Sequence, residues 1–220
     1  LEFRRVLFRS PPFANYFMNE LDKIFLQSKD TGAFATGYLS YLNQVFAGIN
    51  IEEVSNFVKI LLEARERDGQ IFFMGNGGSA ATASHFANDL AIGTRSWNKP
   101  FRAISLTDNQ AIVTAISNDD GYENIFTQQL QALLKKGDMV VAISASGNSK
   151  NLINAIEYAN NNGATTVGIT SFDGGQLHKV AKLGIHVPAN KGEYGPAEDV
   201  HMVLNHLIGA YLTRLVADEK

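Results

Sequence analysis

The sequence predicts a three-layer α/β/α sandwich built on a five-stranded, mostly parallel sheet and preceded by helices. Short apolar runs such as QIFFMG and DMVVAIS have the length of buried strands, and helical patterns separate most of them. Strands that alternate with helices form βαβ units, whose strands run parallel and whose crossovers are right-handed. Strands are expected at residues 70–75, 101–106, 138–144, 164–170 and 183–188.

Amphipathic patterns fill the rest of the chain. Residues 13–67 carry apolar side chains three and four positions apart, which is typical of helices. Asn50 has the position of an N-cap for the last of these segments, and Gly69 follows its end. Further helices are expected over residues 79–92, 110–117, 124–135, 149–162 and 196–217, the last with a proline in its first turn.

The composition limits the class of protein. The 220 residues are 45% hydrophobic and 19% charged, as expected for one soluble globular domain. A net charge of -3 argues against a nucleic-acid partner, and no apolar run has the length of a membrane span. The chain has no cysteine, which excludes disulfides and thiolate metal sites and is compatible with a cytoplasmic protein.

The first ten residues do not follow these patterns. LEFRRVLFRS has no clear helical or strand period, and it matches the translation of a common sequencing adapter in one reading frame. We interpret residues 1–10 as an artefact of this kind and leave them out of the fold prediction. Residues 11–220 are then expected to form a single domain with an N-terminal helical hairpin.

Two glycine- and serine-rich loops follow strands of the predicted sheet. They are GNGGS at residues 75–79 and SASGNS at residues 144–149. Ligands of open parallel sheets bind beyond the carboxyl ends of the strands. The second loop suits a phosphate, because serine hydroxyls, a flexible glycine and the start of a helix combine there. Each loop alone is equally well explained as a tight turn with a serine cap.

Other nucleotide-binding motifs do not match. GNGGSA lacks the spacing G-x-G-x-x-G, and no acidic residue ends the next strand, so a dinucleotide site is disfavoured. The chain also lacks the G-K-[ST] of a P-loop.

Histidines and acids gather on two helices. His85 and Asp89 are four residues apart and share one helix face, about one turn beyond residues 75–79. The last helix adds Glu198, His201 and His206. Two histidines with carboxylates suit Zn²⁺ or another divalent ion. By spacing alone, His201 pairs better with Glu198 than His206 does, since eight residues of helix separate Glu198 from His206 by about 12 Å.

Four segments carry a resemblance to a known family. They are FFMGNGGSAATASHFANDL, ISNDDGYENIF, VAISASGNSKNLINAI and EDVHMVLNHLI. Together they resemble the sugar isomerase (SIS) domain family, and within it the phosphoheptose isomerases, over roughly residues 50–216. The resemblance implies a flavodoxin-like or Rossmann-like sheet and a homotetramer with active sites built between subunits. It also implies the isomerisation of sedoheptulose 7-phosphate in the biosynthesis of lipopolysaccharide heptose.

The resemblance also assigns residues. It implies a zinc site formed by His85, Asp89, Glu198 and His206, with Asp89 as the base and His206 as the acid. Two positions depart from the family pattern, since the family has Glu where Asp89 stands and Gln where Glu198 stands. Because Asp89 is one methylene shorter, Glu198 is an alternative base, and His201 remains an alternative ligand.

The sugar phosphate is expected to contact the two loops and one further acid. Asp119 matches a family aspartate near the sugar hydroxyls, although a turn cap explains it equally well. Two extra residues after Asp89 leave Arg95 without an assignment. The expected substrate-binding residues are Asn76, Gly77, Gly78, Ser79, Asp119, Ser144, Ala145, Ser146 and Ser149.

A second function remains open. Some members of the family resembled here bind a DNA-replication initiator protein and have no catalytic role, so a regulatory phosphosugar-binding protein is the alternative. His85, the acid at position 89 and His206 favour an enzyme, because a binding module does not need them.

Overall fold

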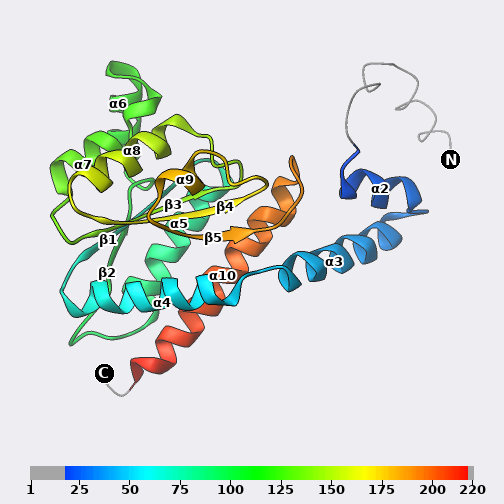
Figure 1. The fold of residues 1–220 in the computed structure, drawn as a ribbon, viewed down its shortest axis with the longest axis horizontal. Helices are drawn as coiled ribbons and strands as arrows, with labels where there is room; N and C mark the ends of the chain where they lie inside the picture. Colours follow the sequence, from blue (N-terminus) through cyan, green and yellow to red (C-terminus); the bar gives the residue numbers. More distant parts are fainter. Residues whose placement is uncertain (1–17, 218–220) are drawn as a thin grey trace. The chain divides into compact units, whose positions relative to one another are not determined.

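The computed structural model describes residues 18–217, and the chain divides into two compact units, one up to Tyr41 and one from Leu42 onward (Figure 1). The division falls within α3 (Thr31–Ala47). Residues 1–10, interpreted above as an artefact, lie outside the described residues.

The N-terminal unit contains the predicted helical hairpin. α2 (Glu20–Gln27) begins with a capping box, in which Asn19 and Asp22 each accept a hydrogen bond from the other's backbone N–H. α2 packs on α3 where Gly37 lies against Ile24, since a Cβ at Gly37 would be 2.5 Å from Ile24 Cγ2. α2 buries none of its residues, so the hairpin leaves apolar side chains on its surface.

The larger unit is built on five parallel strands in the order β2-β1-β3-β4-β5, which confirms the predicted fold class. Every expected strand is present, with ends that differ from the prediction by at most one residue. The strands are β1 (Gln70–Gly75), β2 (Arg102–Ser105), β3 (Met139–Ser144), β4 (Thr165–Ser171) and β5 (Leu183–Val187).

Helices cover both faces of the sheet, as Figure 1 shows. One layer consists of α4 (Ile51–Glu66), α5 (Gly78–Asn88) and α10 (Tyr194–Leu215). The other consists of α6 (Gln110–Asp119), α7 (Thr127–Leu133), α8 (Lys150–Asn161) and α9 (Leu177–Val180). Asn50 caps α4 as predicted, since its side chain accepts a hydrogen bond from Glu52 N–H.

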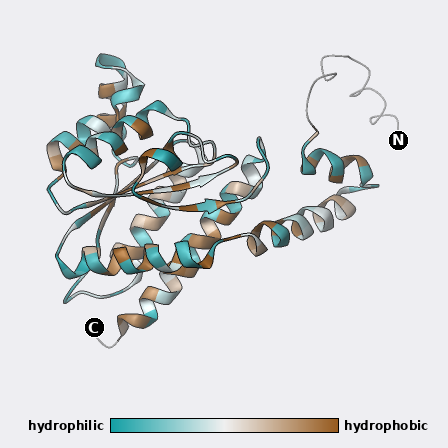
Figure 2. Cartoon of the chain, viewed as in Figure 1, coloured by the Kyte–Doolittle hydropathy of each residue, from teal (hydrophilic) through white to brown (hydrophobic). Residues whose placement is uncertain are grey.

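The core lies between the sheet and these layers. Successive side chains of β1 point to opposite faces, as the two-residue period of a strand requires. Phe72 packs under α7 and α8, whereas Phe73 stacks on Phe86 of α5 with ring centroids 5.0 Å apart. Figure 2 shows hydrophobic residues along the central strands of the sheet. This buried sheet fixes the loops at its carboxyl edge.

Some helices differ from the predicted ranges. The expected helix at 79–92 is α-helical only to Asn88 and continues as a π-helical turn, η1 (Asp89–Gly93). The expected helix at 124–135 is divided into a short 3₁₀ turn, η2 (Tyr122–Asn124), and α7. The short helix α9 was not expected, because four residues carry too little periodicity to be recognised. Among the described helices, none is long and apolar enough to cross a membrane.

Candidate functional site

The sheet has a switch point between β1 and β3. The chain leaves β1 for α5 on one face and leaves β3 for α8 on the other face. Loops that diverge in this way leave a crevice at the carboxyl ends of the strands, where open α/β sheets bind their ligands. Residues 75–79 and 144–149 are these two loops, so the topology brings together the two segments that the sequence indicated.

The first loop depends on glycine at two positions. A Cβ at Gly75 would lie 2.4 Å from the carbonyl oxygen of Ser79, and Gly77 has a φ of 56°. Between them, Asn76 exchanges two amide hydrogen bonds with Asn151 of α8, at 3.0 and 2.9 Å. Tyr122 donates a third, at 2.8 Å, to the Asn76 side-chain oxygen. These bonds attach the first loop to α8, a helix of the layer on the opposite face of the sheet.

The second loop is a tight turn that leads into α8. Ser144 Oγ accepts the Gly147 N–H at 3.1 Å, and a Cβ at Gly147 would lie 2.0 Å from the carbonyl oxygen of Gly174. Ser149 is the N-cap residue of α8, but its hydroxyl makes no capping bond. Ser146 and Ser149 are half-buried, whereas Ser144 is buried. Two hydroxyls and the free N–H groups of a helix start are thus available for an anion.

Three of the four predicted metal ligands lie together. One ligand atom each from His85, Asp89 and His206 lies within 4.8 Å of the others. The His85 and His206 rings are 4.9 Å apart, and His85 Nε2 is 3.4 Å from Asp89 Oδ2. A cavity of about 220 Å³ between η1 and α10 borders Asp89 and His206. Two imidazoles and a carboxylate are a ligand set for zinc, and three protein ligands leave a coordination position open.

Glu198, the fourth predicted ligand, lies near the start of α10, beside the start of α5. Its carboxylate lies against Gly78, where an added Cβ would be 2.2 Å from Glu198 Oε2. It does not belong to the 4.8 Å group among the described residues. Burial, with a smaller contribution from Asp199, raises the pKa of Glu198. The acid therefore faces the first loop of the crevice, where the missing side chain of Gly78 leaves room for it.

His201, the alternative ligand, points to a different part of the fold. It is buried, and its Nε2 lies 3.5 Å from the carbonyl oxygen of Thr170 on β4. Burial lowers the pKa of His201 to about 4. His206, not His201, is the histidine of α10 that lies beside His85 and Asp89.

The remaining predicted residues differ in exposure. Ser79 is buried in the first turn of α5. Asp119 is exposed at the end of α6, where its carboxylate accepts a hydrogen bond from Asn118. His178 and His186 form a separate pair, with ring centroids 5.5 Å apart.

Two residues of the site escaped the sequence prediction. Asn151 holds Asn76, and Asn205 donates from Nδ2 to Asp89 Oδ2 at 3.0 Å. Both asparagines are buried on helix faces that are otherwise mainly apolar. A polar residue within a predicted apolar helix stripe is the signal that could have found them.

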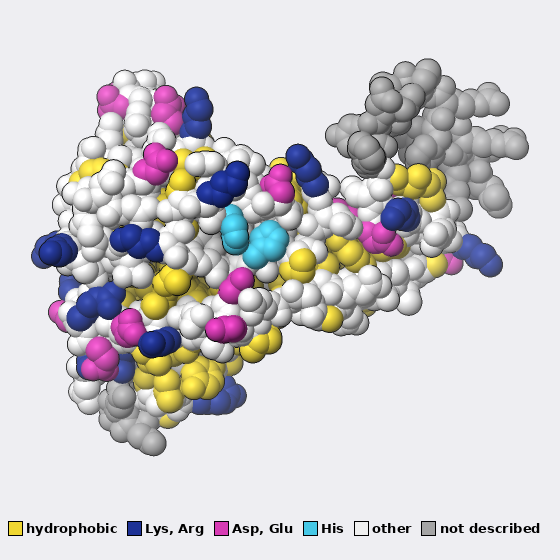
Figure 3. All heavy atoms as spheres, viewed as in Figure 1, with side chains coloured by type: hydrophobic (Ala, Val, Ile, Leu, Met, Phe, Trp, Pro, Cys, Tyr) yellow, Lys and Arg dark blue, Asp and Glu magenta, His cyan; other side chains and the backbone are white. Residues whose placement is uncertain are grey.

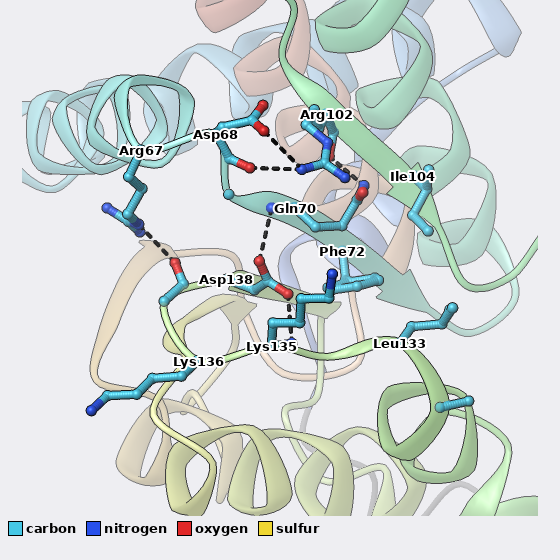
Figure 4. A pocket seen from close by; sticks show the side chains of 13 residues that line it. Arg67, Asp68, Gln70, Phe72, Arg102, Ile104, Leu133, Lys135, Lys136 and Asp138 are labelled. Atoms are coloured by element: carbon cyan, nitrogen blue, oxygen red, sulfur yellow. Dashed lines mark hydrogen bonds and ion pairs between the residues drawn. The ribbon is translucent and has the colours of Figure 1, made fainter.

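A separate pocket of about 470 Å³ lies at the opposite, amino-terminal edge of the sheet (Figure 4). The carboxylates of this pocket are already bound to backbone N–H groups and to a neighbouring arginine. Asp138 accepts the N–H groups of Gln70 and Lys135 at 2.9 and 2.7 Å, and Asp68 pairs with Arg102 at 3.2 Å. These contacts fasten the starts of β1, β2 and β3, so we assign the chemistry to the carboxyl edge instead.

Known proteins share this architecture. A family model for the SIS domain matches residues 36–171. The phosphoheptose isomerase of Aliarcobacter butzleri is 37% identical over 157 residues, which cover 71% of this chain and 82% of that protein. The phosphoheptose isomerase of Leptospira biflexa is 40% identical over 152 residues, which cover 68% and 77%.

Solved structures agree. The phosphoheptose isomerase from Neisseria gonorrhoeae has a TM-score of 0.73 and 29% identity, covering 82% of this chain and 95% of that one. The one from Francisella tularensis, at 24% identity, has the same fold, with a TM-score of 0.75 and coverage of 84% and 99%. Because the SIS domain match spans the first four strands and curated phosphoheptose isomerases align over most of their length, the chain belongs to the SIS domain family, in the branch of the phosphoheptose isomerases.

Proposed function

We propose that this protein isomerises sedoheptulose 7-phosphate to D-glycero-D-manno-heptose 7-phosphate. The observation that carries the proposal is the convergence of His85, Asp89 and His206, in a member of the phosphoheptose isomerase branch. Ketose–aldose isomerisation needs an acid–base pair next to a site that holds the phosphate. The histidine–aspartate group supports the first requirement, and the loop at residues 144–149 supports the second.

The phosphate binds at the start of α8. Ser146 and Ser149 direct hydroxyl donors to it, and the N–H groups of the helix start add a positive partial charge. No lysine is needed for such a site. The Gly75–Ser79 loop allows the sugar chain to lie close to the backbone at Gly77, which carries no side chain and has open space beside it, whereas Glu198 fills the space beside Gly78.

The proton moves from C1 to C2, the two carbons between which the carbonyl group is exchanged. Asp89 takes a proton from C1 of the ketose, and an enediolate forms. The proton then returns to C2, which leaves the aldehyde at C1. His206 acts as the acid that protonates O2 of the enediolate and then takes the hydroxyl proton from O1, so that the carbonyl forms at C1.

His85, Asp89 and His206 are also the residues that would hold a metal ion, and Zn²⁺ is our choice among divalent ions. The fit is supported by the nitrogen and oxygen donor set within 4.8 Å and by the bordering cavity. When bound, the ion supplies positive charge that stabilises negative charge on the substrate oxygens. Glu198 approaches from the Gly78 side and is the proposed fourth residue of the site.

The direct test is turnover. The protein is incubated with sedoheptulose 7-phosphate, and the aldose is followed by NMR. We expect isomerisation that a chelator reduces and added zinc restores. A protein that binds the sugar phosphate but forms no aldose, with or without zinc, would contradict the proposal and favour a non-catalytic phosphosugar-binding protein.

Ser146→Ala tests the phosphate loop. We expect affinity for the sugar phosphate to fall about 10- to 100-fold, since a hydrogen bond to a charged group contributes roughly 1.5–3 kcal/mol. Calorimetry measures the affinity, and the melting temperature should not change. Ser55→Ala, on the exposed surface of α4, is the matched control and should bind normally. Equal affinities in the two variants would show that the loop is only a turn.

Assembly into a homotetramer is part of the proposal. On the N-terminal hairpin, Leu26 and Leu39 are 54% and 61% exposed, and on α10 Leu207 and Tyr211 are 50% and 53% exposed. Figure 3 shows further hydrophobic surface over α4 and the end of α10. Apolar surface of this kind is typical of contacts between subunits. Light scattering at micromolar concentration should give the mass of a tetramer, and a monomer would contradict both the assembly and any shared active site.

A further inference from the structure

The helix that carries His85 changes its winding at the proposed base. α5 ends at Asn88, and the π-helical turn η1 begins with Asp89 itself. A single π turn within a helix disturbs the regular hydrogen bonding, and such turns are frequent at functional sites. An aspartate at this point has a short side chain on a locally irregular backbone, so its direction depends on what contacts the carboxylate.

One contact comes from the neighbouring helix. Asn205 of α10 donates from Nδ2 to Asp89 Oδ2 at 3.0 Å. The same oxygen faces His85 Nε2 at 3.4 Å. A carboxylate only accepts hydrogen bonds, so the amide must present its NH₂ end, which fixes the orientation of Asn205. The Asn205 amide and the His85 ring thus contact Asp89 Oδ2 from two different helices.

The amide has an energetic cost in the fold. Asn205 is completely buried, and its Oδ1 has no hydrogen-bond partner among the described residues. An unpaired buried polar atom is unfavourable. A leucine, which has the same branching as asparagine, would avoid that cost and would continue the apolar stripe formed by Leu204, Ile208 and Leu212. Packing therefore does not explain the asparagine, whereas the bond to Asp89 does.

We propose that Asn205 is a positioning residue for Asp89. Its amide ties α10 to the first residue of the π turn and directs the carboxylate toward His85 and His206. Asn205 itself contacts neither sugar nor metal. The inference rests on the proposed function, since it takes Asp89 as both base and metal ligand.

The test compares stability with metal affinity, because the two should change in opposite directions. For Asn205→Leu we expect an unchanged or higher melting temperature, since the unpaired oxygen is removed. Affinity for Zn²⁺, measured by competition with a chelating dye, should fall 10- to 100-fold, the usual loss when a partner of a metal ligand is removed. At saturating zinc, kcat should fall while KM changes less than about threefold.

Asn160→Leu is the matched control. Asn160 lies on α8, where its amide donates to the Val180 carbonyl and accepts from Thr166, each at 2.7 Å. It is a structural asparagine with both ends satisfied, so its replacement should lower the melting temperature without changing zinc affinity or kcat. If the Asn205→Leu variant does not fold, zinc affinity is measured on Asn205→Ala instead, because alanine removes the same donor without adding volume.

The outcomes separate this inference from the proposed function. A wild-type protein that binds zinc, loses zinc affinity in Asn205→Leu and turns over no sugar phosphate would keep the inference and reject the function. An active wild type, with Asn205→Leu and Asn205→Ala within twofold of it in zinc affinity and kcat, would reject the inference alone. A wild type that binds no zinc would also overturn it.

Discussion

Replacing Asp89 by asparagine is expected to reduce turnover of sedoheptulose 7-phosphate about 1000-fold. Asparagine has the same size, but its amide cannot take up the substrate proton, and a positioned general base contributes roughly 100- to 10,000-fold. The phosphate loop is on other elements, β3 and α8, so affinity for the sugar phosphate should stay within about threefold. NMR measures the rate, and calorimetry measures the binding.

Glu198→Gln is the comparison that separates the two acids. Burial raises the pKa of Glu198, so the site holds this carboxylate at a cost that an uncharged amide of equal size avoids. Glutamine is also the residue that the family resemblance implies at this position. If Glu198 only borders the site, the variant should keep turnover within about threefold of the wild type.

Two results would contradict this assignment. A loss in Glu198→Gln as large as that in Asp89→Asn would make Glu198 the base. Normal turnover in both variants would exclude both acids. The geometry favours Asp89, because it lies with His85 and His206, whereas Glu198 lies against Gly78.

The fold could be predicted almost completely because its signals are local. Each strand is a short apolar run followed by a turn, as in QIFFMG, and the runs become strands that are buried in the middle of the sheet and partly exposed at its edges, β2 and β5. The order of the strands follows less directly, since the alternation of strands and helices predicts a parallel sheet but does not determine which strand lies at its edge. The π turn at Asp89 was not predictable, because the apolar period of α5 continues through it.

The site was predictable where the chain itself brings residues together. His85 and Asp89 share a face of one helix, so their spacing alone indicates a pair. The choice between His201 and His206 was not decided by spacing, which favoured His201. It depends on how α10 is rotated against α5, and the buried stripe that includes Val200 and Leu204 turns His201 toward β4. Packing between helices, not sequence separation, therefore selects His206.

His201 also leads to an expected pH dependence of stability. The histidine is completely buried, and burial lowers its pKa to about 4 from the ordinary value of 6.5. Between these values the unfolded chain binds a proton at this residue and the folded chain does not. Protons therefore stabilise the unfolded chain, and this contribution to the free energy of unfolding is lost as the pH falls from 6.5 to about 4.

The expected loss from this residue is about 2 kcal/mol between pH 7 and pH 5, from a shift of this size at 1.36 kcal/mol per pKa unit. The pKa of the half-buried His186 is also lowered, first by burial and then by His178, so that residue adds to the loss in the same direction. Urea unfolding at both pH values measures the sum in the wild type.

His201→Gln isolates the contribution of the buried histidine, since glutamine does not titrate and keeps a donor for the Thr170 carbonyl. Whatever its stability at pH 7, the variant should lose about 2 kcal/mol less than the wild type on going to pH 5. His178→Gln, at an exposed position, should retain most of the wild-type loss. Equal pH dependence in the wild type and His201→Gln would contradict this prediction, because it would mean that His201 takes up its proton in the folded chain as readily as in the unfolded chain. The buried Nδ1 of His201, which has no hydrogen-bond partner among the described residues, would then need a partner from outside them.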